Sequence, residues 1–137
     1  MQTSAELTDL FRTQGLRVTP QRQAIFRLLH DNDAHPTVDA LYDAARVEMP
    51  TISLKTVYQT VHDLEALGQV SLLDLGTGSV RVDPNVETEH HHLVCTACGR
   101  VRDVAVADVP SLPGRVRKEF HADAVEVIFR GRCTTCS

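Results

Sequence analysis

Residues 53–83 read SLKTVYQTVHDLEALGQVSLLDLGTGSVRVD, and the spacing of their apolar side chains changes once along the way. Ser53 is a favourable helix N-cap, and Gly68 is typical of a helix end. Three apolar residues between them recur at helical spacing: Val57, Val61 and Leu64. The next two segments, QVSLLDL and SVRVD, are short and β-branched, with GTG between them. The stretch therefore predicts a helix followed by a β-hairpin.

Further helices are predicted before this stretch. TPQRQAIFRLLH opens with Thr19 as N-cap and Pro20 at the first helical position. HPTVDALYDAARVEMP has an apolar face that ends before Pro50, and a further helix precedes Gly15. Helices followed by a hairpin form the winged helix-turn-helix, with MPTI joining the two helices of the helix-turn-helix motif.

The second half of the chain is predicted to mix strands with one short helix. HHLVC, RVRDVAV and AVEVIF have strand character, whereas LPGRVRKEF indicates a helix weakened by Pro and Gly. DPNVETE is polar and aperiodic, which places the domain boundary there. We expect an α+β protein with a winged-helix domain over residues 1–82, a hinge over 83–89 and a small α/β domain over 90–137.

Composition limits the function classes. The 137 residues carry a net charge of −4, so DNA binding must rest on a local patch and not on bulk charge. No signal peptide is visible and no apolar stretch approaches the ~18 residues of a membrane span, so we expect a cytoplasmic protein without membrane contact. Neither a Ser/His/Asp order nor an HExxH motif supports hydrolysis, and we predict that the protein is not an enzyme.

All four cysteines of the chain lie in two CxxC pairs, Cys95 with Cys98 and Cys133 with Cys136. A two-residue spacer lets both thiolates reach one tetrahedral Zn²⁺. Structural zinc would fasten the end of the chain to the start of the second half. A redox dithiol, as in a zinc-containing oxidoreductase, and buried thiols are the alternatives, but no thioredoxin-like unit is visible.

The triplet HHH at residues 90–92 suggests a second metal. Alternate strand residues share a face, so His90 and His92 point together while His91 points the other way. His35, Asp83 and Asp103 are candidates for the remaining ligands, and imidazole with carboxylate suits Fe²⁺, Mn²⁺ or Zn²⁺. The alternative is a solvated histidine run on an edge strand, which would make these residues ordinary surface side chains; we expect His91 to be one.

The helix that starts after Ser53 is the candidate for reading DNA. With its apolar face turned inward, small polar and donor side chains near its N-terminus face outward. Three arginines, one of them on the wing, are placed for phosphates. Ordinary solvated residues of a helical bundle are the alternative. The candidate DNA contacts are Arg17, Gln21, Arg22, Ser53, Lys55, Thr56, Tyr58, Gln59 and Arg81.

Five motifs of the chain have an order and spacing that resembles the Fur (ferric uptake regulator) family of metal-dependent repressors. They are RVTPQR, HPT, ISLKTVYQTVHDLEALG, HHHLVCTACG and GRCTTC. The resemblance runs from about Leu10 to Cys136. It implies a winged helix, a hinge, a dimerising α/β domain, zinc on the two CxxC pairs and a palindromic double-stranded operator. Its regulatory site falls on His35, Asp83, His90, His92 and Asp103, with Fe²⁺ or Mn²⁺ as the metal.

Within the family, the chain is most similar to the peroxide-stress branch, because both regulatory carboxylates are aspartates and TPQRQAI and AHPT match. The resemblance then implies iron-catalysed oxidation of a histidine ligand, at His35 or His90. An iron-uptake repressor and a zinc-uptake repressor of the same architecture are the alternatives.

Overall fold

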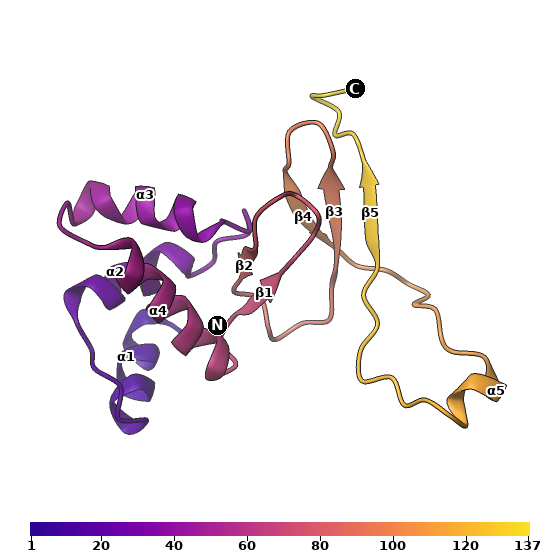
Figure 1. The fold of residues 1–137 in the computed structure, drawn as a ribbon, viewed down its shortest axis with the longest axis horizontal. Helices are drawn as coiled ribbons and strands as arrows, with labels where there is room; N and C mark the ends of the chain where they lie inside the picture. Colours follow the sequence, from indigo (N-terminus) through magenta and orange to yellow (C-terminus); the bar gives the residue numbers. More distant parts are fainter. The chain divides into compact units, whose positions relative to one another are not determined.

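The computed structural model describes all 137 residues and divides them into two compact units, Met1–Thr88 and Glu89–Ser137. The first holds four helices and a two-stranded wing, and the second holds a three-stranded sheet and a short helix (Figure 1). The predicted α+β class with an N-terminal winged helix-turn-helix is therefore confirmed.

Each helix of the first unit begins at a side-chain cap. Thr19 accepts a hydrogen bond from the backbone N–H of Arg22, and Ser53 accepts one from Thr56, as their positions in the sequence predict. Gly68 follows the last helix with φ +69°, a left-handed conformation that favours glycine. The helices are α1 (Ser4–Thr13), α2 (Pro20–Leu29), α3 (Val38–Glu48) and α4 (Leu54–Ala66).

The core of the first unit is aliphatic with one aromatic contact. Phe11 and Phe26 meet edge to face with ring centroids 4.9 Å apart, and the inward faces of α3 and α4 pack around them. Val82 of the wing belongs to the same apolar cluster, so the wing is joined to the helices through the core.

The wing consists of β1 (Ser71–Leu73) and β2 (Arg81–Asp83), paired antiparallel with Ser71 opposite Asp83. Asp83 is thus the last residue of a wing strand. The compact units divide between Thr88 and Glu89. A hinge function for the segment between stays a prediction.

The second unit is built on β3 (His91–Cys95), with β4 (Val101–Val104) antiparallel on one side and β5 (Ile128–Gly131) parallel on the other. The expected strand 124–129 starts later than predicted, at Ile128. The expected helix 112–120 is shorter than predicted: α5 spans Gly114–Arg117, as its flanking proline and its glycine suggest.

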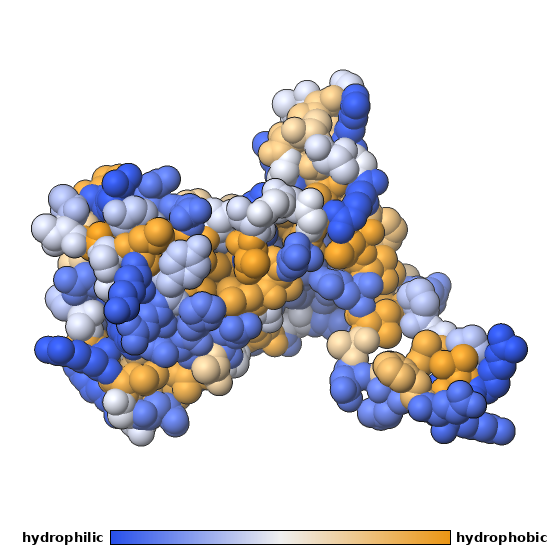
Figure 2. Space-filling model, in the orientation of Figure 1, coloured by the Kyte–Doolittle hydropathy of each residue, from blue (hydrophilic) through white to orange (hydrophobic).

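A long excursion, residues 105–127, connects β4 to β5 and carries α5 (Figure 1). Apolar surface gathers on this excursion (Figure 2), where Phe120 is 61% exposed and Val125 is 45% exposed. None of the helices in the chain combines the length and apolar character needed to cross a membrane.

Candidate metal centres and DNA-reading face

The four cysteines come together at one end of the second unit. Cys95 ends β3, Cys98 follows in the turn that Gly99 closes, and the other pair follows β5. All four sulfur atoms lie within 4.8 Å of one another, and the Sγ atoms of Cys98 and Cys133 are 3.9 Å apart. Tetrahedral coordination with Zn–S bonds of about 2.3 Å requires S···S separations of about 3.8 Å. The cluster therefore fits zinc in both donor type and spacing.

The thiols in this cluster influence one another's protonation. Hydrogen bonds from the backbone N–H groups of Cys133 and Cys98 lower the pKa of Cys95 to about 6. Hydrogen bonding to the Cys136 thiol lowers the pKa of Cys133, whereas the neighbouring sulfurs of Cys133 and Cys98 raise the pKa of Cys136 to about 12. Four thiolates this close together require a cation, and the backbone donors already favour the charged form at Cys95.

The first unit contributes a buried histidine–aspartate pair. Nε2 of His35 lies 3.6 Å from Oδ2 of Asp83, and both side chains are almost fully buried. Backbone contacts fix this geometry: the N–H of Val82 donates to the carbonyl of Pro36 at 2.8 Å, and the Arg81 guanidinium donates to the carbonyl of His35 at 3.2 Å. The loop that carries the histidine is thereby tied to the wing strand that carries the aspartate.

The backbone of His35 has φ +51°, which is left-handed and costs a non-glycine residue on the order of 1 kcal/mol. Its ring is nevertheless fully buried beside a carboxylate. Strain of this kind persists where the surrounding structure imposes it, and it is frequent at binding sites.

The second unit contributes two histidines around one carboxylate. Nε2 of His90 and Nε2 of His92 each lie 3.6 Å from Oδ1 of Asp103, and the two rings are 5.0 Å apart. The pairing of His92 with Asp103 across β3 and β4 brings these side chains together. Alternation along the strand thus places His90 and His92 on one face, as the sequence indicates.

His91 is not a surface residue, and the prediction was wrong on this point. Its side chain is buried, and its Nδ1 accepts a hydrogen bond from the backbone N–H of Val127 at 3.1 Å. Sequence reasoning also missed Glu126, whose Oε1 lies 3.6 Å from Nδ1 of His92. The alternating pattern of AVEVIF puts Glu126 and Ile128 on one face, but only the register of β5 against β3 directs that face toward a histidine.

The second helix of the helix-turn-helix, α4, presents a polar face near its N-terminus. Lys55, Tyr58 and Gln59 are exposed and Thr56 is half-buried, while Val57 points into the core. These side chains suit base edges and thymine methyl groups in a major groove.

The predicted arginine contacts differ in accessibility. Arg17 is exposed and Gln21 is half-buried, both near the start of α2. Arg22 forms a 2.8 Å ion pair with Asp63 and lies over the ring of Phe11, so its placement favours a structural role over the predicted phosphate contact.

Arg81 is half-buried, and its guanidinium donates to Thr77 Oγ1 at 3.2 Å as well as to the carbonyl of His35. Arg81 therefore supports the loop that carries His35.

Comparison with known proteins agrees with this architecture. The model of the ferric uptake regulator family matches residues 13–129. Transcriptional regulator FurA of Mycobacterium tuberculosis is 34% identical over 141 residues, covering 100% of this chain and 94% of that protein. A solved zinc-bound manganese uptake regulator is 30% identical with a TM-score of 0.74, covering 93% of this chain and 98% of that one. The Campylobacter jejuni peroxide stress regulator is 27% identical with a TM-score of 0.66, covering 99% of this chain and all of the other.

A winged helix followed by a small sheet domain with clustered cysteines and histidines defines a metal-responsive DNA-binding regulator. The chain belongs to the ferric uptake regulator family. It is accordingly a metal-dependent transcriptional regulator that binds DNA, and not an enzyme.

Proposed function

We propose that this regulator is a repressor that senses peroxide through a divalent cation bound by His35, Asp83, His90, His92 and Asp103. The observation that carries the proposal is the pair of half-sites, one in each unit. One consists of a histidine and an aspartate 3.6 Å apart, and the other of two histidines around a second aspartate.

The donor set matches Fe²⁺ or Mn²⁺. Imidazole and carboxylate without thiolate suit these ions, and each half-site alone supplies too few donors for the five or six that they prefer. The thiolates of the chain are gathered separately, and we assign Zn²⁺ to Cys95, Cys98, Cys133 and Cys136 as a structural ion.

By sharing one ion, the two half-sites restrain the angle between the DNA-reading unit and the sheet unit. In a dimer that angle sets the separation of the two α4 helices, which must match successive major-groove half-sites. Metal and DNA then favour the same state, a reciprocal coupling typically worth about 1–3 kcal/mol.

Bound Fe²⁺ supplies the redox chemistry, because its reaction with peroxide generates an oxidant that modifies a histidine ligand. His35 and His90 are the proposed targets, because the resemblance to the peroxide-stress branch implies oxidation at these two positions. An oxidised ring binds metal poorly, so His35 or His90 would release the cation and the regulator would leave its operator.

A repressor that responds to the iron level is the second candidate. It is favoured by the family to which the chain belongs, which is named for ferric uptake regulation. The same ligands and the same coupling serve both functions, and the two differ in whether peroxide modifies the protein.

We also propose that the protein is a homodimer on a palindromic operator, and that residues 83–89 act as the hinge. The second unit exposes Leu93, Phe120, Val125 and Phe129, each more than a third accessible. Apolar side chains this numerous on a unit of 49 residues are typical of a surface that a second copy covers.

A DNA-binding assay with Mn²⁺ and Fe²⁺, each with and without peroxide, tests the proposal. We expect both metals to promote operator binding, and peroxide to abolish binding of the Fe²⁺ form alone. Peptide mass spectrometry should then find added oxygen on a peptide containing His35 or His90. Fe²⁺-dependent binding that survives peroxide without oxidation would favour the iron-level regulator instead.

A further inference from the structure

Glu126 lies two residues before β5, and its carboxylate faces a histidine of the sheet. Its Oε1 is 3.6 Å from Nδ1 of His92, within ion-pair range, and half of the Glu126 side chain remains accessible to water. The ring of His92 is itself buried and has its other nitrogen, Nε2, turned toward Asp103. The two carboxylates therefore flank opposite nitrogens of one imidazole.

The register of the sheet produces this arrangement. β5 runs parallel to β3 with Ile128 opposite His92, so Glu126, two residues earlier, shares the face of His92. Two hydrogen bonds fix the intervening residue: the N–H of His92 donates to the carbonyl of Val127 at 3.2 Å, and the N–H of Val127 donates to Nδ1 of His91 at 3.1 Å. Glu126 is consequently held with its carboxylate 3.6 Å from the ring nitrogen, a separation that has to shorten by about 0.5 Å for a hydrogen bond to form.

A histidine that binds a metal through Nε2 must carry its proton on Nδ1. A carboxylate that accepts the Nδ1–H fixes this tautomer, orients the ring and increases its basicity toward the metal. Asp103 lies at Nε2, where His90 also converges, so Nε2 is the nitrogen directed at the proposed ion. Glu126 is at the nitrogen that would bear the proton.

We propose that Glu126 is a positioning residue for the regulatory metal: it accepts the Nδ1–H of His92 and holds Nε2 ready to bind the cation. This inference rests on the proposed role of His92 as a ligand. Glu126 itself does not bind the ion. It acts on the affinity of the site for metal through the Nδ1 side of the His92 ring.

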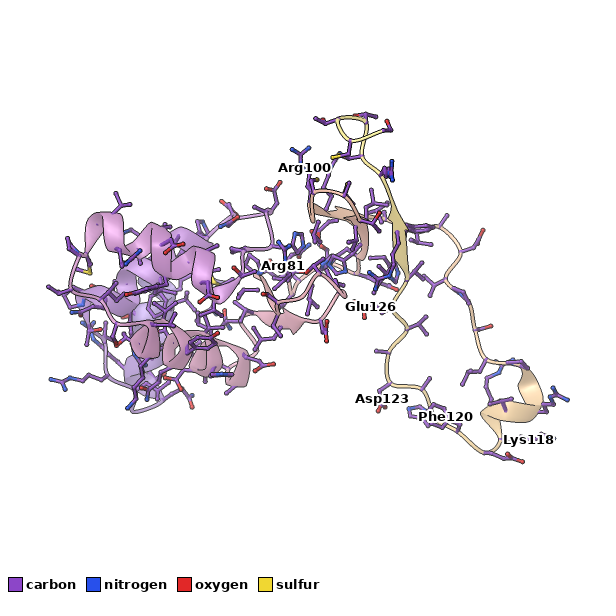
Figure 3. All side chains as sticks on the ribbon, turned by 45° about the horizontal axis from the view of Figure 1, so that its top comes forward. Arg81, Arg100, Lys118, Phe120, Asp123 and Glu126 are labelled. Carbon is purple, nitrogen blue, oxygen red and sulfur yellow. The ribbon has the colours of Figure 1, made fainter.

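The test measures the dissociation constant for Mn²⁺ by calorimetry, on full-length protein with its zinc content verified. Glu126→Ala should weaken Mn²⁺ binding by roughly 10- to 100-fold, and Glu126→Gln, which keeps an oxygen acceptor without the charge, by less. The matched control is Asp123→Asn, which removes a charge from the same excursion, away from the sheet (Figure 3). The control should bind Mn²⁺ like the wild type.

A spectroscopic measurement separates positioning from general stability or charge. In protein given a second equivalent of Zn²⁺ as a diamagnetic probe, ¹⁵N-resolved NMR of the histidine rings should show a slowly exchanging, downfield Nδ1–H at His92. Glu126→Ala should move this proton upfield and accelerate its exchange, whereas Asp123→Asn should change neither.

Failure of the inference and failure of the proposed function give different results. If His92→Ala weakens Mn²⁺ binding but Glu126→Ala leaves both the affinity and the Nδ1–H resonance unchanged, the role of Glu126 is overturned alone. If His92→Ala also leaves Mn²⁺ affinity unchanged, the ligand set itself is wrong and the role of Glu126 is overturned with it.

Discussion

Removing zinc is expected to unfold residues 89–137 and to leave the helical unit folded. The second unit buries few apolar side chains, namely Val94, Cys95 and Val101. Their burial stabilises the folded unit by on the order of 6 kcal/mol. Ordering its strands of five, four and four residues costs roughly 20 kcal/mol in backbone entropy. A structural Zn²⁺ in a small domain typically supplies about 10–16 kcal/mol, more than this small apolar core contributes.

Hydrogen exchange, followed amide by amide before and after chelation under reducing conditions, measures this effect. Protection of β3 and β5 should be lost, while α2 and α4 keep theirs because their core contains no residue of the second unit. Cys136→Ser should reproduce the effect of the chelator, and Thr135→Ser, in the same loop, is the matched control. Persistent protection of β3 amides in zinc-free protein would refute the argument, because the sheet would then be stable on its own packing.

Three further changes test other parts of the structure. Arg22→Ala leaves the carboxylate of Asp63 unpaired beside the core. The variant should lower the free energy of unfolding, measured by chemical denaturation, by about 3 kcal/mol. An unchanged free energy of unfolding would show that the ion pair contributes nothing to stability. Lys55→Ala should reduce the slope of the logarithm of the DNA-binding constant against the logarithm of salt concentration by about 1. Gln59→Ala should relax the preference for particular bases and leave this slope unchanged. The opposite pattern would assign the phosphate contact to Gln59 and the base contact to Lys55. Phe120→Asp should shift sedimentation equilibrium toward monomer. The control is Val47→Asp, at an even more exposed apolar site on α3. A dimer that survives Phe120→Asp would exclude this surface.

Features that depend on a few neighbouring residues could be predicted from the sequence. The caps at Thr19 and Ser53 and the helix end at Gly68 follow from local hydrogen bonding and backbone preference. The convergence of the CxxC pairs also follows, because a two-residue spacer suits one ion and the chain has no other cysteines. The winged helix is the sum of such local signals.

Features that depend on register or on distant partners could not be predicted. The burial of His91 follows from the parallel pairing of β3 with β5, a contact across more than 30 residues that no local pattern specifies. The ion pair of Arg22 with Asp63 requires α2 and α4 to pack side by side, and the sequence alone left Arg22 on the DNA surface.

We propose above that one ion takes ligands from both units. X-ray absorption spectroscopy of Mn²⁺-loaded protein, wild type against His35→Ala, tests it most directly, because multiple scattering from imidazole rings counts the histidine ligands. We expect three histidines on the metal in the wild type and two in the variant. An identical count in the two proteins would contradict it, because the His35 ring would then not bind the ion held by His90 and His92.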